Sequence, residues 1–419
     1  MRVLLLSTTT GYQLRSFVDS AERLGVTLVL ATDRCHHLDD PWRDGAVAVR
    51  FDDDDTSLRA IEEAARDRPL AGVVAVGDRP TVLAARVTEA LRLPGNPVAA
   101  AAITRSKTAM RRTFAAAGLR GPWFVAVPAD ADLLATAGKI HYPCVVKPIG
   151  LSGSRGVIRA DTPRQFVLAV DRVRALLARP DLRAQRSDLN DELLVEGYIE
   201  GSEYAVEGLL TRGELRVLTV FDKPDPLDGP FFEETIYVTP PAMAASLRHA
   251  IEKEVQRATT AIGLVHGAVH AECRVGADGV TMLEVAARPI GGICSKVLRF
   301  AADGRQASLE EVLLRHALGE EVSRFVREPQ SAGVMMIPIP RRGFYRGVAG
   351  QDAARRVEHI EELRITAKPD QLIEPLPEGD SYLGFIFARA SGPDAVVRSL
   401  REAHTRLTFE MAPALTIIR

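Results

Sequence analysis

Two glutamates form the clearest metal-binding pattern in the sequence. Glu272 and Glu284 stand in two apolar runs that are joined by the turn Gly276-Ala-Asp-Gly279, which predicts a hairpin. Because side chains alternate between the two faces of a strand, both carboxylates can point to one face. Proteins commonly hold Mg²⁺ through one or two carboxylates and the phosphates of a substrate. The pair is therefore a candidate cation site, and two unrelated surface glutamates are the alternative.

Candidate phosphate ligands accompany this pair. Arg288 follows Glu284 by four residues, and its planar guanidinium suits carboxylate or phosphoryl oxygens. Lys147 ends an apolar run just before the glycine- and serine-rich loop 150–156, whose backbone N–H groups can clamp phosphates. Lys107, expected on a helix, is a further cation. For both lysines the alternative is a surface charge that aids solubility.

A strand and a turn suggest a place for a nucleoside. Glu196-Gly-Tyr-Ile199, with Glu203 after it, has the form of a strand that runs into a turn and out again. The main chain there can contact the edge of an adenine, while Glu203 can accept ribose hydroxyls. An ordinary turn explains the same residues, so both interpretations stay open at this point.

The elements that must position these residues fall into four segments. Short apolar runs alternate with amphipathic stretches from residue 2 to residue 91, which predicts βαβ units on a parallel sheet. One helix is expected over 99–117, and the tail from about residue 330 is expected to be a small separate α+β unit. The predicted domains are an N-terminal α/β domain, a lid, a core with the metal and substrate site, and the tail, at 1–105, 106–195, 196–330 and 331–419.

Composition indicates a globular protein of two to three domains. The chain has 419 residues, of which 46% are hydrophobic and 26% charged, and its mean hydropathy is +0.00. A net charge of -2 provides no positive field for nucleic acid, and no apolar run approaches the ~20 residues of a membrane span. Four scattered cysteines, Cys35, Cys144, Cys273 and Cys294, fit neither a zinc site nor a disulfide framework. We therefore expect a cytoplasmic protein with no nucleic-acid or membrane partner.

Several common enzyme motifs are missing. The sequence has no G-x-G, no G-K-[ST], no G-x-S-x-G and no H-E-x-x-H. These absences exclude the Rossmann fingerprint, the kinase glycine loop and the Walker A loop, and they argue against the commonest hydrolases and zinc proteases.

Taken in order, the chemical residues resemble the ATP-grasp superfamily over about residues 100–295. Within it, the chain is similar to the L-amino acid ligase group through His270-Ala-Glu272, the turn from Arg288 to Gly292, and its tail. The resemblance implies a multidomain α/β and α+β protein. This protein would have an ATP-grasp fold, an N-terminal βαβ parallel-sheet domain and a small C-terminal α+β unit.

The resemblance also implies a role for each candidate residue. Lys107 and Lys147 would hold ATP phosphates, Ser152, Gly153 and Ser154 would form the lid over them, the main chain of Glu196, Tyr198 and Ile199 would contact adenine, and Glu203 would bind ribose. Glu272 and Glu284 would bind one or two Mg²⁺ ions, with Mn²⁺ as an alternative. Arg288 would lie over the transferred phosphoryl group and the acyl substrate.

Substrate contacts are implied by the same resemblance. Glu233 or Glu234, at the end of the long loop after Phe221, would receive a substrate ammonium, and Gly291 would lie beside the substrate. His270 is either a substrate contact or a core histidine. Many ATP-grasp enzymes have an asparagine two residues after the second metal carboxylate, where this chain has Ala286, which puts the second metal ion in doubt.

The implied activity is an ATP-dependent carboxylate–amine ligase. It would form an amide, dipeptide-like in the first instance, through an acylphosphate, with release of ADP and phosphate. Its partners would be a small-molecule carboxylate and an amine, with amino acids expected, and the resemblance allows a homodimer. The alternatives are a different acid, a thiol or another nucleophile as acceptor, and a non-catalytic nucleotide-binding protein. The sequence does not identify the acid, the amine or the pathway.

Overall fold

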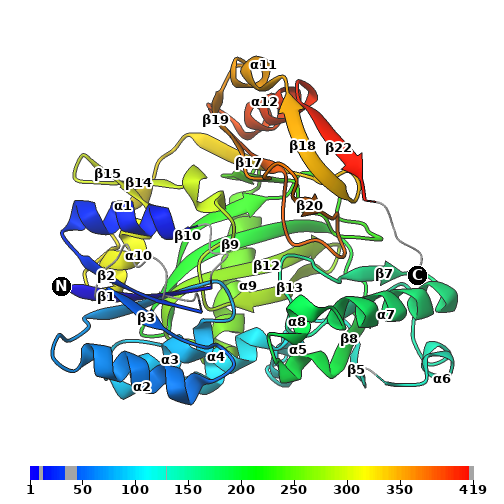
Figure 1. The fold of residues 1–419 in the computed structure, drawn as a ribbon, viewed down its shortest axis with the longest axis horizontal. Helices are drawn as coiled ribbons and strands as arrows, with labels where there is room; N and C mark the ends of the chain where they lie inside the picture. Colours follow the sequence, from blue (N-terminus) through cyan, green and yellow to red (C-terminus); the bar gives the residue numbers. More distant parts are fainter. Residues whose placement is uncertain (9–12, 34–44, 129, 415–419) are drawn as a thin grey trace.

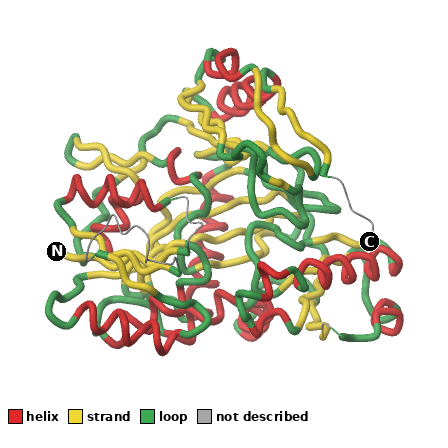
Figure 2. Tube along the Cα trace, viewed as in Figure 1, coloured by secondary structure: helices red, strands yellow, loops and turns green. Residues whose placement is uncertain are grey.

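The computed structural model describes residues 1–8, 13–33, 45–128 and 130–414 (Figure 1). Five sheets and the helices around them make up this part of the chain. Figure 2 shows helices flanking the sheets in the lower half of the view and an additional unit at the top. The expected boundaries between the four segments stay predictions.

The N-terminal segment forms the parallel sheet that the sequence predicts. Strand order is β3-β2-β1-β4, with each pair parallel. Val3 to Leu6 of the first strand are completely buried, as expected for a parallel strand covered on both faces. The elements are β1 Arg2–Ser7, α1 Leu14–Leu24, β2 Thr27–Thr32, β3 Ala46–Ala48, α2 Asp54–Ala65, β4 Gly72–Val76 and α3 Thr81–Ala90.

The single helix expected over 99–117 is wrong, because two helices occupy this stretch. Helix α4 covers Val98–Arg105 and α5 covers Lys107–Ala116. Ser106 between them is extended, with φ -117 and ψ 107, and its hydroxyl accepts a hydrogen bond from the N–H of Ala109. Serine favours this N-cap role because its oxygen satisfies a free N–H of the first helical turn. The break places Lys107 at the beginning of a helix rather than inside one.

The lid segment is a four-stranded antiparallel sheet with helix α7 packed on it. Strand order is β5-β8-β6-β7, and strands β6 and β7 form a hairpin around the glycine- and serine-rich loop. The elements are β5 Phe124–Pro128, α6 Leu133–Ala137, β6 Cys144–Pro148, β7 Ile158–Ala160, α7 Pro163–Leu177, α8 Pro180–Arg183, η1 Asp188–Asn190 and β8 Glu192–Gly197.

An eight-stranded sheet forms the centre of the molecule, in the order β13-β12-β9-β10-β11-β17-β21-β19. Helix α9 packs on one side of it through a core that includes Val220, Ile251 and Val255. Its elements before the tail, and those packed beside it, are β9 Ser202–Thr211, β10 Glu214–Asp222, β11 Ile236–Thr239, α9 Ala245–Ile262, β12 His266–Gly276, β13 Gly279–Ala286, η2 Cys294–Val297, β14 Arg299–Ala302, β15 Arg305–Ser308, α10 Leu309–Ala317 and β16 Val326–Arg327.

The tail has the expected α+β content, but it is not separate. Strand β17 pairs with β11, so three tail strands extend the central sheet, and a further sheet, β20-β18-β22, lies above it in Figure 1. The tail elements are β17 Ser331–Ile337, β18 Gly343–Ala349, α11 Gln351–Arg355, β19 Ile360–Ile365, β20 Leu372–Ile373, β21 Gly384–Ala390, α12 Pro393–Thr405 and β22 Thr408–Pro413.

The sequence predicted neither a disulfide framework nor a membrane span. Cys144, Cys273 and Cys294 are buried free thiols, and Cys35 lies outside the described residues. Within the described ranges, every helix is too short or too polar to cross a membrane.

Candidate active site

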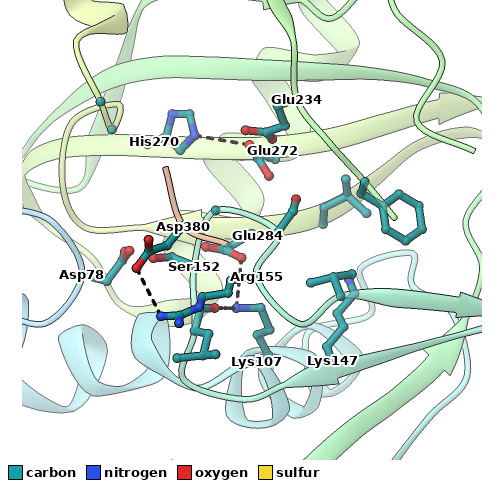
Figure 3. Close-up of a pocket in the computed structure, with 18 of the residues that line it drawn as sticks. Asp78, Lys107, Lys147, Ser152, Arg155, Glu234, His270, Glu272, Glu284 and Asp380 are labelled. Carbon is teal, nitrogen blue, oxygen red and sulfur yellow. Dashed lines mark hydrogen bonds and ion pairs between the residues drawn. The ribbon is translucent and has the colours of Figure 1, made fainter. Parts of the chain in front are cut away.

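One cavity of about 450 Å³ brings together nearly all the predicted site residues (Figure 3). It lies where the lid, the central sheet, the N-terminal segment and the tail meet. The predicted residues in its lining are Lys107, Lys147, Ser152, Gly153, Ser154, Glu196, Tyr198, Ile199, Glu203, Glu234, His270, Glu272, Glu284, Arg288 and Gly291. Glu233 is the exception among the predicted residues.

Lys107, which we predicted to hold ATP phosphates, lines the cavity beside the lid loop. Its ammonium donates a hydrogen bond to the carbonyl oxygen of Leu151, in the lid loop 150–156, and lies 3.5 Å from a carboxylate oxygen of Glu284 (Figure 3). Because Ser106 begins helix α5 immediately before it, the lysine is fixed at a helix end that faces the loop. The loop and the cation can therefore act on the same anionic group.

Lys147 is bound to the buried carboxylate of Glu196. The sequence analysis had given Glu196 only a main-chain role, as a contact for adenine. Glu196 is 1% exposed. It accepts hydrogen bonds from Arg111 Nε at 2.6 Å and lies 2.6 Å from Lys147 Nζ. Burial opposes ionisation of Glu196, but the two cations outweigh it and lower the pKa of this carboxyl to about 2. The side chain of Glu196 therefore holds Lys147 in place. Arg111 was not among the predicted residues.

Lys223 is the main residue that the sequence analysis missed. Its side chain is 3% exposed, and its ammonium donates to Glu203 at 2.8 Å, Glu234 at 2.6 Å and Glu272 at 2.8 Å. Burial acts to lower the pKa of Lys223, but the three carboxylates raise it well above its usual value. The available signal was a lysine directly after an apolar strand, followed by Pro224.

The metal-binding prediction rests on Glu272 and Glu284, and their positions fit it. The two residues are directly opposite each other on strands β12 and β13, and both line the cavity. Directly opposed residues of an antiparallel pair point to the same face. Carboxylate oxygens of Glu203, Glu234 and Glu272 also lie within 4.8 Å of one another, although Lys223 already bridges them. The donor set suits a hard cation such as Mg²⁺.

Arg288 is buried and fixed by a residue of the N-terminal segment. Its Nε and Nη2 atoms donate to the two carboxylate oxygens of Asp78, at 2.9 Å and 3.2 Å. Burial acts to raise the pKa of Asp78, but Arg288 outweighs it and the pKa is lowered. Asp78 follows strand β4 and was not predicted, because its partner is 210 residues away in the sequence.

His270 lies in the cavity lining and is also firmly bound on its other side. Its Nδ1 atom is hydrogen-bonded to the buried Glu207, and its Nε2 atom lies 3.5 Å from Glu272 (Figure 3). Glu207 accepts a further hydrogen bond from the N–H of Ile290. Burial acts to lower the pKa of His270, but Glu207 raises it to about 9. The imidazole therefore has a hydrogen-bond partner in the protein interior and also lines the cavity.

The two acidic candidates for a substrate ammonium are separated by the structure. Glu234 lines the cavity, whereas Glu233 is outside its lining. Tyr382 and Cys294 lie near Glu234, and this carboxylate helps to raise the pKa of both groups after burial, the larger cause. The carboxylate therefore has an apolar and aromatic surface beside it.

The tail also closes over the lid loop. Arg155 of the loop donates to the carbonyl oxygen of Glu378 at 3.0 Å and to Asp380 at 3.2 Å. Arg172 of helix α7 forms an ion pair with the carboxylate of Glu378. Asp380 and Tyr382 line the cavity. The tail segment 374–382 is therefore part of the site.

Three family models match the chain. The ATP-grasp domain matches residues 140–297, the ATP-grasp N-terminal domain matches residues 18–95, and the L-amino acid ligase C-terminal domain 2 matches residues 335–412. The matches fall on the core and lid, the parallel-sheet segment and the tail.

The chain is also similar to individual known proteins. The solved structure of an L-amino acid ligase from Bacillus licheniformis is similar over 99% of both chains, with a TM-score of 0.83 and 26% identity. The uncharacterised protein y4rH of Sinorhizobium fredii is 23% identical over 98% of this chain and 84% of its own length. The alanine–anticapsin ligase of Bacillus subtilis is 27% identical over 46% of this chain, and the match spans less than half, 42%, of that ligase. The chain belongs to the ATP-grasp family of carboxylate–amine ligases.

Proposed function

We propose that this protein joins a carboxylate to an amine through an acylphosphate, with ATP converted to ADP and phosphate. The observation that carries the proposal is the single cavity in which Lys107, Lys147, Arg288 and the opposed pair Glu272 and Glu284 meet. Binding a nucleotide alone does not require the whole set. The products would be amides, with dipeptides the first class to test.

ATP would lie between the lid and the central sheet. Lys147, fixed by Glu196, and Lys107, fixed beside the lid loop, would neutralise its phosphates. The main chain near Tyr198 and Ile199 would contact adenine, and Glu203 would accept ribose hydroxyls. Glu203 is held in place by ion pairs with Lys223 and Arg274.

Glu272 and Glu284 would hold Mg²⁺, because two opposed carboxylates that line one cavity suit a hard cation. The bound ion would supply positive charge that draws electron density from the phosphate oxygens. Around it, Lys107 contacts Glu284 and Lys223 contacts Glu272, so these lysines fix the carboxylates. Either one ion or two is compatible with the pair, and Mn²⁺ has the same ligand preference.

In the first chemical step, an oxygen of the substrate carboxylate would attack the γ-phosphorus, and ADP would leave. Arg288 would balance the charge that develops on the phosphoryl group and the acyl oxygen, because its guanidinium faces the cavity from a fixed position on Asp78. The amine would then attack the acyl carbon, and phosphate would leave with the oxygen that came from the carboxylate. The lid loop and the tail segment 374–382 would exclude water from the acylphosphate.

Glu234 would receive an ammonium group of an amino-acid substrate. Its carboxylate is bound to Lys223 and lines the cavity together with Tyr382, whose pKa it helps to raise after burial, the larger cause. A carboxylate beside an apolar surface suits an amino acid with an uncharged side chain better than a simple acid. This arrangement favours an amino acid over a non-amino acid substrate.

Phosphate release from ATP and Mg²⁺ tests the proposal, with amino acids offered singly and in pairs and products weighed by mass spectrometry. We expect release that needs a pair, with a new mass equal to the sum of the two less water. Glu284→Gln should lose at least about a hundredfold in rate because a ligand and a charge are removed. Release with a single acid would indicate another acceptor. No release with any pair, while ATP still binds, would contradict the proposal.

A further inference from the structure

A second cavity, also of about 450 Å³, lies apart from the proposed active site and is lined by three arginines. One wall is formed by residues 216–220 of strand β10. These residues precede Asp222, where β10 pairs with Val238 of β11. The turn after β11, the beginning of helix α9, and strands β14 and β16 form its other walls. Its lining is Arg216, Val217, Leu218, Thr219, Val220, Pro240, Pro241, Met243, Ala245, Arg248, Phe300, Phe325, Val326 and Arg327.

The charge in this cavity is all of one sign. No aspartate or glutamate is among the described residues of its lining. Arg216 donates to the carbonyl oxygens of Val322 and Phe325, and Arg327 donates to the carbonyl oxygen of Gln330. These carbonyls hold the two guanidinium groups in place but carry no compensating charge.

Nearby positive charges act on one another. Burial, together with Arg389 and Arg248, lowers the pKa of Arg327, and Glu328 offsets this only in part. Burial likewise lowers the pKa of Arg216. A pKa below the usual value means that the charged guanidinium is disfavoured in the empty site. An anion would relieve this cost.

Helix α9 adds to the positive potential. Its N-cap is Ala244, whose methyl side chain cannot accept a hydrogen bond, and its first turn contains no acidic residue. The positive end of the helix dipole therefore lacks the usual negative partner. Arg248 lies in the same turn, where a cation is unfavourable, and its Nε atom is paired with Glu252 at 2.8 Å on the same helix.

Most of the remaining lining is apolar. It consists of valine, leucine, proline, methionine, phenylalanine and alanine, with Thr219 as the polar exception. A hydrated inorganic ion would leave this surface without contacts, whereas an organic anion would cover it.

We propose that this cavity binds a small organic anion, with a phosphate or carboxylate group held by Arg248, Arg327 and the first turn of helix α9, and an apolar body against Phe300 and Phe325. The inference is independent of the proposed ligase chemistry. It assigns a second ligand to the protein, at a place that the nucleotide does not occupy.

Phenyl phosphate is a suitable probe, because it joins a phosphate to an apolar ring. Its binding would be measured by calorimetry on the full chain, with saturating ADP and Mg²⁺ to fill the first cavity. We expect one phenyl phosphate per chain. Arg327→Gln and Arg248→Gln should each weaken binding by about tenfold or more, since a charge-assisted hydrogen bond is lost. Benzyl alcohol, the neutral comparison, should not bind.

Arg257→Gln is the matched control, since it removes the same charge from the exposed side of the same helix. It should leave the affinity unchanged, and equal ADP binding by all variants would show that they are folded. The proposal would be overturned if the ADP-loaded protein bound no phenyl phosphate. Equal affinities of the wild type, Arg327→Gln and Arg248→Gln would overturn it as well.

Discussion

Glu196 and Lys223 show how single residues organise the site. Each is a buried charge with several partners of opposite sign, which is the condition under which a buried ion is tolerated. The sequence predicted Glu196, Glu203 and Glu272 as site residues, but it could not pair them with Arg111 or Lys223. Arg111 lies 85 residues from Glu196, and such pairings follow only from the fold.

The carboxylate of Glu196 should make stability depend on pH in a defined window. Its folded pKa is lowered from 4.5 to about 2, so its contribution is present above about pH 4.5 and is lost as the pH falls towards 2. Glu196→Gln should lower the free energy of unfolding by about 3 kcal/mol near pH 7 because two buried cations lose their partner. This difference in the free energy of unfolding between the wild type and Glu196→Gln should be smaller at low pH, where Glu196 becomes protonated. Urea unfolding near pH 7 and near pH 3 measures it.

Glu192→Gln, an exposed position on the same strand, is the control and should change little at either pH. A deficit for Glu196→Gln of the same size at both pH values would contradict the role given to this carboxylate.

Glu234 and Glu233 provide a matched pair for substrate binding. Glu234→Gln should raise the KM for the amino-acid substrate by about tenfold or more, because a charged hydrogen bond to its ammonium is lost. Glu233→Gln should behave nearly as the wild type, since this residue is outside the cavity lining. Steady-state kinetics with the substrate pair found in the screen would measure both. An equal effect of the two substitutions would exclude the assignment of Glu234.

At the scale of elements, local patterns predicted strands and helices well where periodicity was regular. The hairpin of β12 and β13 turns between Gly276 and Gly279, as the sequence predicted. The prediction of one helix over 99–117 was wrong because Ser106 caps a new helix within a continuous helical pattern. The sequence does not distinguish a capping serine from a serine inside a helix, because the two differ in their backbone angles. The same break carries Lys107 into the site.

The contact between lid and tail should control water access. Arg155→Gln removes hydrogen bonds to Glu378 and Asp380, so the lid loop should open more often. We expect more ATP hydrolysed per amide formed, because water then competes for the acylphosphate. Arg164→Gln, at an exposed position of helix α7, is the control. Unchanged coupling of hydrolysis to amide formation in Arg155→Gln would show that the tail does not protect the intermediate.

At the scale of the whole molecule, one apolar core joins segments that the sequence analysis treated as separate. It contains Val3 and Leu5 of β1, Phe221 of β10, and Val334 and Phe385 of the tail. The fold class was predictable from the alternating apolar runs and from the family resemblance that the ordered motifs carry. The continuity of the central sheet into the tail was not, because pairing between β11 and β17 leaves no local signal.

A chain that ends at residue 330 should therefore not fold as a soluble monomer. The truncation removes the partner of β11 and leaves an apolar edge and part of the shared core exposed. Size-exclusion chromatography and thermal unfolding followed by circular dichroism would show aggregation or the loss of a cooperative transition. A soluble monomer with a sharp transition would mean that the tail is an independent unit after all.

Transfer of oxygen from the substrate carboxylate to phosphate would show whether the amide forms through an acylphosphate. The carboxylate substrate would be labelled with ¹⁸O, and the masses of the released phosphate and the amide would be measured after reaction with ATP, Mg²⁺ and the amine. We expect the phosphate to gain one labelled oxygen for each amide formed, because the acylphosphate breaks at its acyl carbon. Amide formation with unlabelled phosphate would exclude an acylphosphate.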